Sequence, residues 1–242
     1  MLYDTVSVAA GTTVAHSIMG TRGGAGVYQH DSVTPEAAVA DWIECAVLLA
    51  GRGLQISQFL CVDAGLITEP AVHDLARVVA RDVRVTYTDH VRNVAAVGGL
   101  QLSGEDPGQV RYLHANPATS DVHAFDPAWD VLDPDRPVAV IVPPRAGQRG
   151  PRTYQVMRQL VAGLPSGSLL ALAAATTDRP ACAERGRGEA VTPSGDYSLD
   201  QVHRLFDGLD LLGPGVLPVW RWTCGPRAGR ATLAWAGLGR RP

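Results

Sequence analysis

The sequence predicts a single α/β domain of the doubly wound type, in which a mostly parallel sheet carries helices on both faces. Short apolar runs typical of buried strands alternate with stretches of helical apolar spacing through most of the chain, and this alternation favours parallel strands joined by helices. The 242 residues are 46% hydrophobic and 19% charged, which provides enough apolar surface for one large core. No internal repeat and no change of composition divides the chain.

The first predicted helix marks where the domain begins. Residues 1–33 are rich in Gly, Ser and Thr and are expected to form an irregular segment or a flap. Thr34 can cap a helix and Pro35 suits its first position, so a helix is predicted over residues 37–50, where glycines end it. Residues 34–242 are therefore expected to form the domain.

The remaining elements follow in alternating order. Apolar runs predict strands at residues 56–62, 83–88, 110–114, 138–142 and 168–174. Helical spacing predicts helices at residues 72–79, 91–97, 154–162 and 199–209. The C-terminal pattern differs, because residues 216–222 and 231–238 flank a Gly-Pro turn and predict an antiparallel hairpin. The polar stretch 176–194 is expected to be a long loop.

Composition argues against several functional classes. A formal net charge of −3 provides no general basic field for a nucleic-acid backbone, so nucleic acid is not an expected partner. No apolar run is long enough to span a bilayer and the first residues do not resemble a signal peptide, so we expect a cytoplasmic protein without a membrane partner. The chain contains no lysine, which removes Schiff-base chemistry and the lysine of a phosphate-binding P-loop.

The cysteine pattern does not predict a metal site or a disulfide framework. Cys45, Cys61, Cys182 and Cys224 are widely spaced, with no Cys-x-x-Cys pair and no histidine at zinc-finger spacing. We therefore expect reduced and mostly buried thiols, and no bound metal.

Two segments that follow predicted strands have the chemistry of a ligand site. Asp63, Ala64 and Gly65 follow the first strand, where small residues let the backbone approach a ligand and the next helix offers free N–H groups. Asp89 ends the second strand, and this order predicts a nucleoside site in which Asp89 binds the ribose hydroxyls. The same residues also fit an ordinary strand-end turn and a helix cap, so on their own they leave both interpretations open.

Four stretches of the chain resemble a bacterial family of S-adenosylmethionine-dependent methyltransferases that was first catalogued as a domain of unknown function. These stretches are residues 58–89, 135–140, 165–172 and 205–222, and they occur in the family's order. The resemblance covers roughly residues 47–238. It implies the Rossmann-like, seven-stranded methyltransferase fold, in which the final hairpin inserts an antiparallel strand.

The first motif of this family is altered in the present chain. The family pattern is approximately Phe-Leu-Asp-Ile-Gly-Ser-Gly-Leu-Pro-Thr. Cys61 stands at its acid, Asp63 at its first glycine, Ala64 at its serine and Gly65 at its second glycine. The resemblance implies that the Asp63 carboxylate either meets the ammonium group of the cofactor or repels its carboxylate, and the sequence leaves both outcomes open.

Other site residues follow from the resemblance. Asp89 matches the acid that binds the ribose, and His90 follows it where the adenine edge would lie. Asn116 stands where the family has an aspartate that binds the adenine amino group, and its side-chain oxygen can accept from the same donor. The implied cofactor is S-adenosylmethionine, and its implied binding residues are Asp63, Ala64, Gly65, Asp89, His90 and Asn116.

The predicted function is transfer of a methyl group from S-adenosylmethionine to a small molecule, such as a secondary metabolite. The sulfonium is already activated, so alignment of the acceptor can suffice, and no residue is assigned as a catalytic base. The segments that would shape the acceptor pocket, residues 143–147 and the region of residues 19–20, depart most from the family. The alternative is a methyltransferase-like protein that has lost methyl transfer and acts as a binding or scaffold protein, or as a non-redox cyclase.

Two further enzyme classes lack their motifs. A nicotinamide-dependent oxidoreductase would need a three-glycine fingerprint or a Tyr-xxx-Lys pair, and a hydrolase of the α/β type would need Gly-x-Ser-x-Gly. None of these is in the sequence. Oligomeric state stays open, because Trp220 and Trp222 fit either the interface of a homo-oligomer or alternating core packing.

Overall fold

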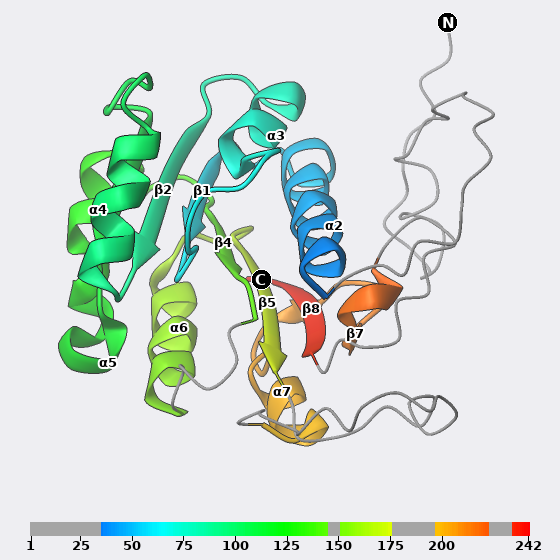
Figure 1. The fold of residues 1–242 in the computed structure, drawn as a ribbon. Helices are drawn as coiled ribbons and strands as arrows, with labels where there is room; N and C mark the ends of the chain where they lie inside the picture. The colour runs from blue at the N-terminus through cyan, green and yellow to red at the C-terminus, as the bar shows by residue number, and fades with distance from the viewer. Residues whose placement is uncertain (1–34, 145–150, 176–196, 223–233) are drawn as a thin grey trace, which may run out of the picture.

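The computed structural model describes residues 35–144, 151–175, 197–222 and 234–242 (Figure 1). The expected N-terminal flap, the expected loop at residues 176–194 and the turn of the C-terminal hairpin lie outside these ranges. Cys182 and Cys224 also lie outside them. Among the described residues, no helix combines the length and the apolar character needed to cross a bilayer.

One sheet forms the centre of the described chain. Its strands are β1 (Gln58–Cys61), β2 (Arg84–Asp89), β3 (Val110–His114), β4 (Ala139–Val142), β5 (Leu169–Ala175), β6 (Asp210–Leu211), β7 (Leu217–Pro218) and β8 (Ala234–Arg240). Their order is β3-β2-β1-β4-β5-β8-β6, with β7 paired to β8 outside this path. The first five strands run parallel, whereas β8 is antiparallel to its three neighbours. Strand order reverses between β1 and β4, where open α/β sheets bind their ligands.

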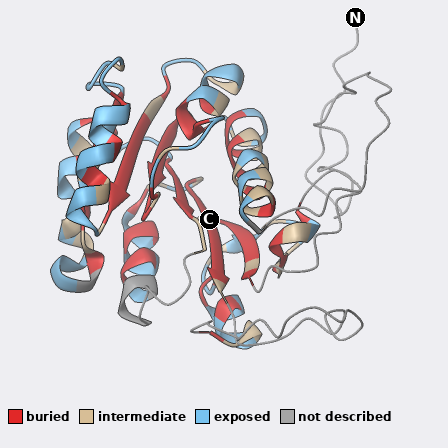
Figure 2. Ribbon diagram, viewed as in Figure 1, coloured by how far each residue is buried: buried red, intermediate tan, exposed pale blue. Residues whose placement is uncertain are grey.

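Helices cover both faces of this sheet, as the alternation of the sequence predicts. One face carries α2 (Pro35–Leu48), the π-helical turn η1 (Leu49–Gly53), α3 (Val72–Val79) and α4 (Arg92–Gln101). The other carries α5 (Pro117–Ser120), the 3₁₀ helix η2 (Asp121–Asp130), α6 (Pro151–Gly163) and α7 (Leu199–Arg204). Figure 2 shows that the central strands are buried, whereas the helices bury one side and expose the other.

The central strands are apolar on both sides because each side faces a separate core. In β1, Phe59 and Cys61 belong to the core under α2 and α3, while Leu60 and the following Val62 belong to the core under η2 and α6. Successive side chains of a strand point to opposite faces, so a strand covered by helices on both faces becomes a continuous apolar run. This pattern is what made β1, β4 and β5 recognisable in the sequence.

Three local expectations differ from the structure. The helix predicted over residues 199–209 ends at Arg204, and Gly208, with φ 83°, turns the chain into β6. The strand predicted over residues 216–222 stops at Pro218, because proline has no N–H to continue the ladder, and a short 3₁₀ helix η4 (Val219–Arg221) follows. The helices α5 and η2 were not predicted, since their short, Pro-containing turns lack a sustained helical period.

The C-terminal strand β8 is inserted between β5 and β6, as the resemblance implied. Gly237 and Gly239 on this strand leave room for the buried Phe206, because a Cβ at either glycine would lie 2.9 Å from its ring. Trp222 is buried and its indole N–H donates to the carbonyl of Ala236. Core packing therefore explains Trp222, whereas Trp220 is half-exposed.

Candidate functional site

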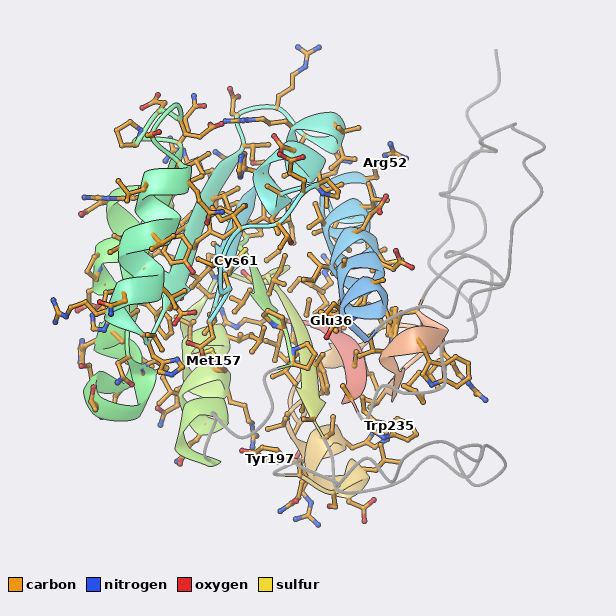
Figure 3. The ribbon with its side chains drawn as sticks, viewed as in Figure 1. Glu36, Arg52, Cys61, Met157, Tyr197 and Trp235 are labelled. Atoms are coloured by element: carbon orange, nitrogen blue, oxygen red, sulfur yellow. The ribbon has the colours of Figure 1, made fainter. Side chains whose placement is uncertain are left out.

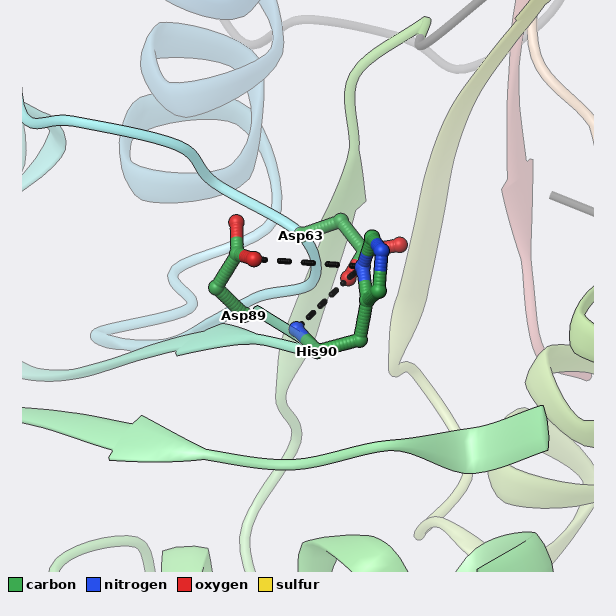
Figure 4. A group of neighbouring side chains, drawn as sticks. All are labelled: Asp63, Asp89 and His90. Atoms are coloured by element: carbon green, nitrogen blue, oxygen red, sulfur yellow. Dashed lines mark hydrogen bonds and ion pairs between the residues drawn. The ribbon is translucent and has the colours of Figure 1, made fainter. Parts of the chain in front are cut away.

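The carboxyl ends of β1, β2 and β3 lie side by side because these strands are parallel neighbours. Cys61 of β1 pairs with Tyr87 of β2, and Asp89 at the end of β2 pairs with His114 of β3. Figure 4 shows Asp63, Asp89 and His90 converging at this edge. The structure thus brings together the two segments that the sequence singled out.

The turn after β1 keeps the shape of a glycine turn although Asp63 stands at its first glycine position. Asp63 has φ 51° and Gly65 has φ 73°, and both values belong to the left-handed region. Aspartate is among the few residues with a side chain that enter this region readily. The amide of Ala64 donates to the carbonyl of Thr88 at 2.9 Å, which ties the turn to β2.

The Asp63 carboxylate is directed at His90. Its Oδ1 accepts from the His90 ring Nδ1 at 2.9 Å and from the His90 backbone N–H at 3.3 Å. An ionised carboxylate only accepts hydrogen bonds, so Nδ1 carries the proton and Nε2 of a neutral ring is left as an acceptor. Asp63 is buried, whereas the His90 side chain is 26% exposed. The imidazole of this pair is therefore partly exposed, and the carboxylate is buried behind it.

Asp89 joins the turn after β1 to the start of α4. Its Oδ2 accepts from the amide of Gly65 at 3.1 Å, and its Oδ1 accepts from the amide of Val91 at 2.8 Å. The side chain is fully buried. Removing this carboxylate would leave two N–H donors without their acceptor, so Asp89 fixes the edge on which a cofactor would lie.

Cys61 does not replace the acid that the family has at its position. Its side chain lies in the interior of the molecule (Figure 3), and burial raises the pKa of its thiol well above the usual range. The group is therefore neutral at ordinary pH. This chain has its acidic residue two positions later than the family pattern, at Asp63.

Asn116 lies at the same edge, two residues beyond β3. Its carbonyl accepts from the amides of Thr119 and Ser120, so it begins α5, and its side chain is half-buried. His114, at the end of β3, has its Nε2 3.1 Å from the carbonyl of His90. The contact with adenine predicted for Asn116 stays a prediction.

Asp63, Asp89 and His90 also offer ligand atoms within 4.8 Å of one another. Such spacing suits a metal ion. Both carboxylates, however, already accept hydrogen bonds from the imidazole or from backbone amides. Contacts within the chain account for the geometry, and we assign no metal to it.

Sequence reasoning did not identify three side chains that hold the loop between β1 and α3. The hydroxyl of Tyr112 donates to the carbonyl of Gly65 at 2.6 Å, and the side chain of Gln101 exchanges two 3.0 Å hydrogen bonds with the backbone of Ile67. At the far end of the loop, the hydroxyl of Tyr87 accepts from the amide of His73 and contacts its ring. The sequence signal for Tyr87 and Tyr112 was an aromatic residue at a buried strand position, which is typical of any core, and Gln101 at the end of α4 had none.

His73 is expected to make stability depend on pH. The pKa of His73 is lowered, mainly because the side chain is buried. The carboxylates of Asp74 and Glu105 oppose this by raising the pKa, and the nearby Arg77 lowers it. The folded state therefore holds His73 neutral at a pH where the unfolded chain takes up a proton. Stability should fall as the pH drops below about 6.5. In urea unfolding between about pH 7 and pH 5.5, His73→Gln should lose less stability than the wild type, and equal losses would contradict this assignment.

A sheet of this order, with an antiparallel strand inserted near its C-terminal edge and an acid at the end of β2, defines the Rossmann-like class of methyltransferase folds. The model of one family, S-adenosyl methyltransferase, matches residues 28–242. The chain therefore belongs to the S-adenosyl methyltransferase family. No curated protein sequence matches it.

Solved structures agree with this assignment. A DUF574 family protein from Streptomyces avermitilis is 27% identical, with a TM-score of 0.68 over 85% of this chain and 83% of that protein. A candidate methyltransferase from Thermobifida fusca is 24% identical, with a TM-score of 0.68 over 86% and 81% of the two chains. The plantazolicin methyltransferase BamL, solved with a desmethyl plantazolicin analogue and SAH, is 9% identical with a TM-score of 0.55 over 85% and 86%, and it shares the fold alone.

Proposed function

We propose that this chain binds S-adenosylmethionine across the carboxyl ends of β1, β2 and β3 and transfers its methyl group to a small molecule. One observation carries the proposal: Asp63 preserves the glycine-type turn and directs its carboxylate at His90. The Asp63 carboxylate at the altered position is therefore hydrogen-bonded to His90. Membership of the S-adenosyl methyltransferase family supports the same cofactor.

The residues at this edge fit the cofactor in distinct ways. The small Ala64 and Gly65 would lie against its amino-acid part, and His90 would meet the adenosine with the exposed face of its ring. Asp89 fixes both loops, and because a carboxylate has four acceptor positions, the ribose hydroxyls remain its predicted partners. Asn116 would accept from the adenine amino group.

Methyl transfer demands little acid–base chemistry from this chain. When bound, S-adenosylmethionine supplies a methyl group already activated on a sulfonium. The protein's own residues have to hold the cofactor, align the acceptor and exclude water. We propose a small molecule, such as a secondary metabolite, as the acceptor.

A second function is favoured by one specific observation. The acid of the family motif is replaced by the neutral thiol of Cys61, which removes a charge that would face the cofactor's ammonium group. A chain that binds the nucleoside part but aligns the methionyl part poorly would act as a binding protein without methyl transfer. Tight binding of S-adenosylhomocysteine without turnover of any acceptor supports this alternative.

His90→Ala tests the proposed cofactor site directly. The imidazole is partly exposed, but its loss also leaves the buried Asp63 carboxylate without its ring partner, so urea unfolding must first show that the variant is folded. Loss of a polar contact with the ligand should weaken S-adenosylhomocysteine binding by roughly tenfold. His123→Ala is the matched control, because this exposed histidine on η2 also pairs with an aspartate, Asp126, at 3.2 Å. Calorimetric titration of both variants should show weaker binding only for His90→Ala. Equal affinities for both variants and the wild type would exclude His90 from the site.

A further inference from the structure

Gly65 is hydrogen-bonded to a side chain through both its N–H and its carbonyl group. Its N–H donates to Asp89 on β2, and its carbonyl accepts from the hydroxyl of Tyr112 on β3 at 2.6 Å. Gly65 has φ 73°, and a glycine without such contacts exchanges readily between several backbone conformations. The conformation of the turn is therefore set by two side chains that are far away in sequence.

The position of Tyr112 is itself fixed by its surroundings. Its ring is buried and stacks on the ring of Tyr87, with centroids 5.8 Å apart and an angle of 18° between the planes. On α4, Gly98 leaves the space that the ring occupies, because a Cβ at this position would lie 2.2 Å from Cδ2 of Tyr112. A glycine in the middle of a helix costs stability, and here it allows the hydroxyl to reach the turn.

We propose that Tyr112, seated against Gly98, is a positioning residue for cofactor binding. Its hydroxyl holds the Gly65 carbonyl so that the backbone of Ala64 and Gly65 is already in the bound conformation before a ligand arrives. The entropy of ordering this turn is then lost on folding and not on binding, which raises affinity. The inference rests on the proposed function, since it assigns to Tyr112 an effect on the same site without contact to the cofactor.

Tyr87 provides a matched control within the same stack. It is a buried tyrosine whose hydroxyl also bonds to this loop, but it does so at His73, where α3 begins. Tyr87→Phe and Tyr112→Phe each remove one buried hydroxyl and preserve both rings. A purely structural role predicts that the two variants behave alike. A positioning role predicts that only Tyr112→Phe alters the site.

The experiment compares these two variants with the wild type in three measurements. Urea unfolding establishes that each variant is folded, and calorimetry gives its affinity for S-adenosylhomocysteine. Hydrogen exchange of the peptide covering residues 62–68 reports the order of the turn without any ligand. Tyr112→Phe should bind about 3- to 10-fold more weakly, the loss expected for one hydrogen bond, and should exchange faster in this peptide. Tyr87→Phe should bind within about twofold of the wild type.

Gly98→Ala provides an independent test, because it displaces the Tyr112 ring without removing the hydroxyl. It should weaken binding and accelerate exchange in residues 62–68 in the same way. Folded Tyr112→Phe protein with wild-type affinity and exchange overturns the inference and leaves the proposed function standing. Wild-type protein that fails to bind S-adenosylhomocysteine overturns both.

Discussion

Asp89→Ala is expected to abolish S-adenosylhomocysteine binding and to destabilise the protein by about 2–5 kcal/mol. The substitution leaves the buried amide of Gly65 and the partly buried amide of Val91 without their acceptor, and an unsatisfied buried donor costs about 1–3 kcal/mol, less where water can reach it. It also removes the predicted ribose ligand. Thermal unfolding should show a lower transition temperature and no further rise when S-adenosylhomocysteine is added, since a ligand stabilises only a protein that binds it.

Two further variants separate the site from general destabilisation. Asp89→Asn keeps the size of the side chain but turns an NH₂ group toward one of the two donors, so it should fold and still lose most of the ligand-induced stabilisation. Asp130→Ala removes an exposed aspartate on η2 and should respond to ligand as the wild type does. A ligand response that is unchanged in Asp89→Asn would show that Asp89 plays no part in binding.

Phe206→Ala should reduce the free energy of unfolding by about 3–5 kcal/mol, which is the usual cost of an emptied aromatic site in a core. The ring is 4% exposed and lies against Gly237 and Gly239 of β8. Losing it would open a cavity between α7 and the inserted strand. Because total stability is only about 5–15 kcal/mol, a change of this size is easily measured by urea unfolding.

The contrast for this variant is an exposed apolar residue. Leu100 on α4 is 74% exposed, and Leu100→Ala should change stability by less than about 0.5 kcal/mol. A free energy of unfolding for Phe206→Ala within about 1 kcal/mol of the wild-type value would contradict the packing of Phe206 against β8.

The central strands could be predicted from the sequence because they are buried on both sides. β4 and β5 appear as uninterrupted apolar runs, β1 as an apolar run that begins after the polar Gln58, and the predicted range of β3 agrees with Val110–His114. Elements at the margin of the fold have no such signal. The two-residue strand β6 and the short turns of α5 and η2 depend on tertiary contacts, which local periodicity does not record.

The place of the site could be predicted, but its contacts could not. Residues at the ends of parallel strands must meet at one edge, so Asp63 and Asp89 were expected to be near each other. The direction of the Asp63 carboxylate depends on the φ of the turn and on the His90 ring, and the resemblance left two outcomes open. The hydrogen bond from Tyr112 to the turn depends on the space that Gly98 of α4 leaves for the ring. No local sequence pattern connects Gly98 with the turn after β1.

The central claim is tested most directly by calorimetric titration of the wild-type protein with S-adenosylmethionine, S-adenosylhomocysteine and ATP. We expect micromolar binding of the first two ligands. We expect no binding of ATP, because a triphosphate would lie beside Asp63 and Asp89 at an edge without a lysine. A folded wild-type protein that binds neither S-adenosyl compound, or that binds ATP equally well, would contradict the assignment of this edge as a site for S-adenosylmethionine.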